Sequence, residues 1–101
     1  MNARPPAIVR LTARFEGHVQ GVGFRYTAIE VAARLGDITG YVTNTMQGDV
    51  ELIAEGPEDH LHELLMQLQQ SHLGRYIMHM DQQWSPAQGS FKGFDILFNV
   101  K

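Results

Sequence analysis

The chain has 101 residues, no cysteine and a net charge of −3, and 44% of its residues are hydrophobic and 19% charged. This length predicts one domain with a modest core that buries roughly two-thirds of the surface of the unfolded chain. The negative charge disfavours nucleic acids and anionic membranes as partners, because both bind basic surfaces. The lack of cysteine excludes disulfides, a thiolate zinc site and a cysteine nucleophile. No apolar run approaches the ~20 residues of a membrane span, and we expect a cytoplasmic protein.

The first part of the chain predicts a strand followed by a helix. Residues 1–6 are expected to be a disordered tail, and residues 7–101 a single domain. Residues 7–16 alternate between apolar and polar side chains, which is the period of a half-buried strand. From Phe24 to Leu35 apolar residues recur every three or four positions, as in an amphipathic helix, and Gly36 is placed to end it.

The second part predicts a hairpin, a helix and two further strands. Residues 40–45 and 49–55 are joined by a short turn, which indicates an antiparallel pair with Glu55 and the other acids facing outward. Pro57 and the acids after it favour a helix start, with a buried leucine stripe before an end at residues 71–74. Residues 75–84 predict a weaker strand, residues 85–93 a polar loop, and residues 94–100 a last strand.

The order β-α-β-β-α-β with a terminal strand indicates an α+β, ferredoxin-like fold. In this split β-α-β sandwich, two helices lie on one face of a mostly antiparallel sheet. Because the fold serves many functions, the function must be argued from the site. RNA-recognition modules share the topology and stack bases on aromatic residues of an inner strand. The matching strand here, at residues 49–55, has three acids and no aromatic residue, so RNA binding is set aside.

The loop between the first strand and the first helix is rich in glycine, with Gly17, Gly21 and Gly23. Glycine tolerates positive φ and the close approach of a ligand, so the loop can turn several amide N–H groups toward one point. The loop leads into a helix N-terminus, where unpaired N–H groups and the helix dipole favour an anion. No Ser, Thr, Asp or Asn lies between Gly17 and Arg25 to cap the helix, so Gly21 or Gly23 must do so.

Two polar residues could act on such an anion. Arg25 lies in the first helical turn, where an exposed cation costs roughly 0.3–1 kcal/mol, and a bound phosphate or carboxylate would reverse that sign. An ordinary surface arginine after a glycine turn is the alternative. Asn44 lies near the end of a strand that we expect to neighbour the first strand. Asn44 could open the hairpin turn, or it could point its amide at a water beside the anion.

The motif Gly17–Arg25, followed by Gly40–Asn44, Gly48–Glu51 and Gly56, resembles the acylphosphatase family. The similarity is closest over residues 12–56 and continues more weakly beyond them. The resemblance implies the fold derived above and the hydrolysis of acyl phosphates to a carboxylate and inorganic phosphate. It also implies that the reaction uses no metal and no cofactor.

The resemblance further assigns roles to residues. The guanidinium of Arg25 would bind the phosphoryl group, and Asn44 would position the water that attacks phosphorus in line. The phosphate-binding loop would consist of Gly17, His18, Val19, Gln20, Gly21, Val22, Gly23 and Phe24. Such a reaction needs mainly positioning and charge stabilisation, which agrees with the lack of a visible protein base. The expected partner is a small acyl phosphate, with the protein a monomer that binds neither nucleic acid nor membrane.

Three features depart from the family pattern. The link Gly36–Gly40 is one residue longer than usual, so Asn44 keeps its face of the sheet only if the loop absorbs that residue. Thr43 replaces a longer, often basic side chain, and Tyr41 replaces the commoner tryptophan. Two alternatives to an enzyme stay open: a phosphate-binding module of the same fold without turnover, and a regulatory small-molecule domain in which Arg25 has no role.

Overall fold

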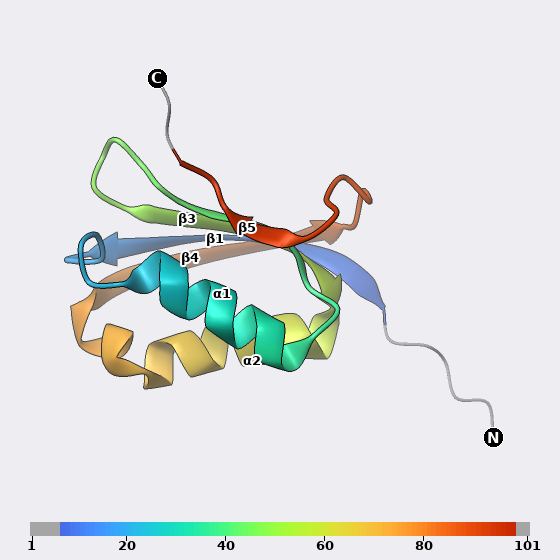
Figure 1. Cartoon of the computed structure of the whole chain (residues 1–101), viewed down its shortest axis with the longest axis horizontal. Coiled ribbons are helices and arrows are strands. Elements are labelled where there is room, and N and C mark those ends of the chain that lie inside the picture. The colour runs from blue at the N-terminus through green and yellow to red at the C-terminus, as the bar shows by residue number, and fades with distance from the viewer. Residues whose placement is uncertain (1–6, 99–101) are drawn as a thin grey trace.

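The computed structural model describes residues 7–98, so the tail predicted at residues 1–6 lies outside the described part. The elements in chain order are β1 (Ile8–Gly17), α1 (Phe24–Leu35), β2 (Thr39–Asn44), β3 (Val50–Pro57), α2 (Glu58–Gln70), the 3-10 helix η1 (His72–Tyr76), β4 (Ile77–Pro86) and β5 (Phe94–Ile96). The strands form one sheet in the order β4-β1-β3-β2-β5, and both helices lie on the same side of it (Figure 1). All pairings are antiparallel except β2 with β5, which confirms the predicted α+β fold. Within residues 7–98 no helix is long and apolar enough to cross a membrane.

Three expectations about the elements were wrong in detail. β2 does not neighbour β1, because β3 pairs with β1 from Ile8↔Pro57 to Phe15↔Val50 and so lies between them. η1 occupies the first residues of the predicted fourth strand, so β4 starts at Ile77. β5 ends at Ile96, earlier than the predicted Val100, which itself lies outside the described residues.

The core lies between the sheet and the two helices. Its residues are the apolar positions that the strand alternation and the helical periodicity of the sequence predict to face inward. β1 contributes Leu11, Ala13 and Phe15, each no more than 1% exposed. The helices contribute the predicted apolar stripes, which are Phe24, Ala28, Val31 and Ala32 from α1 and Leu61, Leu64, Leu65 and Leu68 from α2. Since β1 and β2 are both antiparallel to β3, they run in the same direction. The loop after β1 and the turn after β2 therefore lie at the same end of the sheet (Figure 1).

The link before β2 ends in a turn that leaves Asn44 on the helix side of the sheet. Gly36 and Asp37 both take positive φ, at 81° and 61°, which completes the turn before Thr39. The register then pairs Val42 with Leu52, and both side chains are fully buried on the helix side. Because side chains alternate along a strand, Asn44 projects from the same side of the sheet as Val42.

The opposite face of the sheet is partly covered by the loop before β5. Glu55 points outward as predicted, yet it is only 4% exposed. Its carboxylate accepts hydrogen bonds from Arg10 Nε at 2.8 Å and from the N–H groups of Gln88 and Gly89 at 2.8 and 2.9 Å. The Arg10 guanidinium also lies 5.2 Å from the centre of the Phe91 ring. Glu55 therefore fastens this loop to the sheet.

The free energy of unfolding should depend on pH through Glu55. Burial alone would raise the pKa of Glu55, but the hydrogen bonds from Gln88, Arg10 and Gly89 outweigh burial and lower it. A pKa that is lower in the folded state stabilises the protein above the unfolded pKa, and this stabilisation is lost as the pH falls through the folded pKa. We expect Glu55→Gln to destabilise the protein at about pH 7, and this effect should shrink progressively as the pH falls below about 4, the unfolded pKa, toward the lower folded pKa. Urea unfolding across this range measures the difference, and a difference independent of pH would contradict the role of Glu55.

Candidate active site

The glycine-rich loop is fastened to η1 where β1 ends. The His18 N–H donates a hydrogen bond to the Tyr76 carbonyl at 3.0 Å. A Cβ on Gly17 would collide with that same carbonyl, which explains the glycine at this position. The Val19 side chain, 1% exposed, then anchors the loop in the core. The start of the loop is thus held by contacts with η1 and the core. The His18 N–H is bonded to the Tyr76 carbonyl and is not free to bind a ligand.

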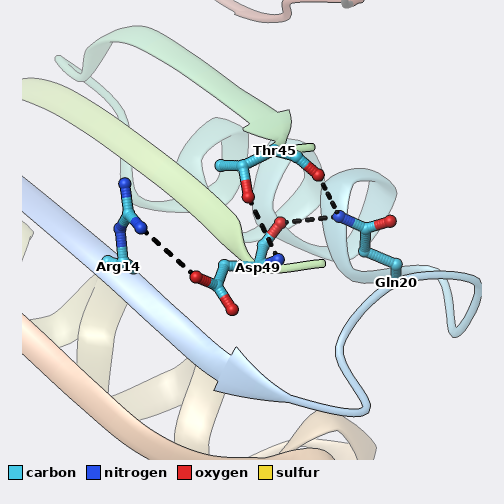
Figure 2. Close-up of polar contacts among 4 residues, drawn as sticks. All are labelled: Arg14, Gln20, Thr45 and Asp49. Atoms are coloured by element: carbon cyan, nitrogen blue, oxygen red, sulfur yellow. Dashed lines mark hydrogen bonds and ion pairs between the residues drawn. The ribbon is translucent and has the colours of Figure 1, made fainter. Parts of the chain in front are cut away.

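Gln20 fastens the middle of the loop to the β2–β3 turn (Figure 2). Its side-chain Nε2 donates to the carbonyls of Thr45 and Asp49, both at 2.8 Å. Thr45 closes the turn, because its N–H donates to the Asp49 carbonyl at 2.9 Å and its Oγ1 accepts from the Asp49 N–H at 3.1 Å. Arg14 on β1 adds an ion pair to the Asp49 carboxylate at 3.3 Å. The loop, the turn and the end of β1 therefore form one connected unit.

Gln20→Glu should separate the loop from the turn. The substitution keeps the shape of the side chain but replaces the donor with a charged acceptor that faces two carbonyl oxygens. Each carbonyl keeps a backbone donor, from Gly48 to Thr45 and from Thr45 to Asp49, but both side-chain hydrogen bonds are lost. This loss, with a charged acceptor held against two carbonyl oxygens, should lower the free energy of unfolding by about 1–3 kcal/mol. Urea unfolding measures this loss, and Gln70→Glu, at an exposed position of α2, is the matched control. A Gln20→Glu variant as stable as that control would show that the bridge is not formed.

The remaining amides of the loop are open. Within residues 7–98, the N–H groups of residues 19–24 donate to no protein acceptor. Gly21 and Gly23 have φ values of 78° and 83°, and a Cβ on either would meet nothing within 4 Å. The positive φ, and not crowding, therefore requires glycine at both positions. Gly23 is the N-cap of α1, and no side chain caps this helix end.

Arg25 lies beside these amides as the second residue of α1. Its guanidinium lies 5.5 Å from the centre of the Phe98 ring, and its side chain is half-buried. In the described part of the chain, no carboxylate forms an ion pair with it. The first turn of α1 also contains no acid. A cation at a helix N-terminus is unfavourable, and no carboxylate in the described part of the chain compensates for Arg25 there.

Asn44 ends β2 next to the turn that Gln20 holds. The hydrogen bonds that close this turn come from Thr45, Gly48 and Asp49, and within residues 7–98 none involves the Asn44 side chain. The interpretation of Asn44 as a turn residue therefore gains no support, and its amide is left for another partner. Asn44 lines a groove of about 440 Å³ whose wall includes Phe98, the residue that also contacts Arg25.

Sequence reasoning missed the contacts that position these groups. Thr43, which stands where the family often has a basic residue, has a buried side chain whose hydroxyl donates to the Leu97 carbonyl. This bond holds the chain after β5 along β2, next to Phe98. No local signal predicts it, because the partners are 54 positions apart. Over the described residues, no group of His, Asp and Glu side chains is arranged to hold a metal ion.

Both the sequence and the fold match one family of known proteins. The sequence model of the acylphosphatase family matches residues 11–96. The chain belongs to the acylphosphatase family. It is 41% identical over 87 residues to an acylphosphatase from Salinibacter ruber (86% of this chain and 90% of that relative) and to one from Thermobifida fusca (86% and 94%). The crystal structure of an acylphosphatase from Bacillus subtilis matches with a TM-score of 0.79 at 27% identity, over 88% of this chain and 98% of that one.

Proposed function

We propose that this protein hydrolyses acyl phosphates to a carboxylate and inorganic phosphate. The observation that carries the proposal is Arg25, which lies beside the open amides of residues 19–24 and forms no ion pair with a described carboxylate. A guanidinium and unpaired N–H groups at a helix N-terminus suit a phosphoryl group, because both stabilise negative charge. Acylphosphatase relatives at 41% identity support the choice of an acyl phosphate as substrate.

In the proposed mechanism, the Gly17–Phe24 loop and Arg25 hold the phosphoryl oxygens, and Asn44 orients a water molecule. The water oxygen forms a bond to phosphorus while the bond from phosphorus to the acyl oxygen breaks, and the carboxylate leaves with the electron pair. A phosphate oxygen takes the proton of the water. Catalysis then depends on positioning and on fixed positive charge, which is what phosphoryl transfer requires.

The main alternative is a module of the same fold that binds phosphate without turnover. Such a module would be expected if the register of β2 turned Asn44 to the opposite face of the sheet. The pairing of β2 with β3 leaves Asn44 on the helix side, which supports an enzyme over this module. A regulatory small-molecule domain would give Arg25 no role, whereas the described structure leaves its guanidinium without a carboxylate partner.

Hydrolysis of benzoyl phosphate, followed by its ultraviolet absorbance in the presence of a chelator, tests the proposal. We expect turnover well above the rate in buffer, with competitive inhibition by inorganic phosphate. Phosphate binding without hydrolysis would favour the binding module. A folded protein that neither hydrolyses benzoyl phosphate nor binds phosphate would contradict the proposal.

A further inference from the structure

The 3-10 helix η1 contacts the glycine-rich loop at two points. The Tyr76 carbonyl accepts from the His18 N–H near the start of the loop. Near its end, Nε2 of the His72 ring lies 3.2 Å from the Val22 carbonyl oxygen. A carbonyl oxygen can only accept, so the ring nitrogen is the donor in this contact. η1 thus contacts the loop just before the open amides and again within them, at the peptide between Val22 and Gly23.

η1 is itself held rigidly, so it can serve as a support. Its residue Leu73 has a fully buried side chain. Ser71 Oγ accepts from the Leu73 N–H at 3.1 Å and donates to the Leu68 carbonyl at 2.6 Å, which ties the start of η1 to α2. Gly74 lies so close to the Gln69 carbonyl that no Cβ fits there. The backbone that carries His72 therefore has little freedom to move.

The contact of His72 with Val22 determines where a loop N–H points. The peptide between Val22 and Gly23 is planar and trans, so its C=O and N–H point in opposite directions. While His72 holds the carbonyl toward η1, the Gly23 N–H must point away from η1. Rotation of this peptide would change ψ of Val22 and φ of Gly23, and glycine at position 23 permits φ of either sign, so its own preference does not fix the peptide.

We infer that His72 is a positioning residue that aims the Gly23 N–H at the phosphoryl group. This inference rests on the proposed function, since it assigns a support to the same anion site. His72 touches no substrate, and its effect passes through the Val22–Gly23 peptide. Its ring is exposed, so its loss should have little effect on the stability of the core.

His72→Phe removes the donor but keeps a ring, and His72→Gln restores an N–H at a similar reach. We expect His72→Phe to lower kcat/KM for benzoyl phosphate, and to weaken inhibition by inorganic phosphate, each by about 3- to 10-fold, as for the loss of one hydrogen bond. His72→Gln should recover most of both. The midpoint of thermal unfolding should stay unchanged, and the NMR amide resonance of Gly23 should shift in His72→Phe and return in His72→Gln.

His60→Phe is a matched control, because His60 Nδ1 lies 2.8 Å from the Gly36 carbonyl at the other end of α1. Its loss removes the same kind of contact, and phosphate inhibition should stay as in the wild type. If the wild type is active but His72→Phe is unchanged, the inference about His72 is wrong and the proposed function stands. The same holds if His72→Phe loses activity and His72→Gln does not restore it. A wild type that neither hydrolyses benzoyl phosphate nor binds phosphate would overturn the proposed function, while the Gly23 resonance would still test the positioning.

Discussion

Arg25→Ala is expected to lower kcat/KM for benzoyl phosphate by about 10³- to 10⁵-fold, by analogy with arginines that stabilise phosphoryl transfer in other enzymes. Arg25 is the one cation that the fold places in the first turn of α1, next to the open amides of the loop. Its guanidinium can bind two phosphoryl oxygens at once, and their negative charge must be stabilised while the bond to the acyl oxygen breaks.

The stability of Arg25→Ala should differ little from that of the wild type. Removing a cation from a helix N-terminus is favourable by roughly 0.3–1 kcal/mol, and losing the contact with Phe98 is unfavourable by about 0.5–1 kcal/mol at an exposed site. These two changes nearly cancel. Urea unfolding can therefore separate the loss of activity from a loss of fold.

Two variants sharpen the Arg25 experiment. Arg34→Ala is the control, because Arg34 lies in the last turn of the same helix and donates to Gln67 at 2.9 Å. Its activity should be unchanged. Arg25→Lys keeps the charge but loses the two parallel hydrogen bonds, so it should recover only part of the rate. An Arg25→Ala variant within tenfold of the wild type would show that Arg25 does not hold the phosphoryl group.

Asn44→Ala should lower kcat by about 10²- to 10³-fold, as does the loss of one preorganised donor in other active sites. In the proposed mechanism Asn44 orients the water and does not bind phosphate. Inhibition by inorganic phosphate should therefore change by no more than about twofold. Steady-state kinetics with benzoyl phosphate, with phosphate as inhibitor, measures both quantities.

Gln47→Ala is the matched control for Asn44, because Gln47 lines the same groove from an exposed position of the turn. Its kcat should equal that of the wild type. If Asn44→Ala weakened phosphate binding as strongly as it lowered kcat, Asn44 would be a phosphate ligand and the assignment of the water would be wrong. If neither changed, Asn44 would have no part in the reaction.

Several parts of the structure could be predicted from sequence because their signals are local. The period of β1, the helical period of α1 and the hairpin of β2 and β3 each depend on residues within a few positions of one another. The glycines of the loop and Arg25 in the first turn belong to this group, because a capless helix start is visible in the sequence itself. These patterns predicted the α+β fold and the residues proposed to bind phosphate.

The side chains that hold the phosphate-binding loop and the sheet in place are brought together only by the tertiary structure. Gln20 reaches carbonyls 25 and 29 positions away, His72 reaches one 50 positions away, and Glu55 binds Arg10 across 45 positions. These contacts depend on the order of strands in the sheet, and sequence reasoning placed β2 beside β1 when β3 lies between them. Local patterns report which face of an element is apolar, but they do not report which elements meet. The residues proposed to act on phosphate could thus be read from the chain, while the side chains that hold their loop in place could be found only in the folded protein.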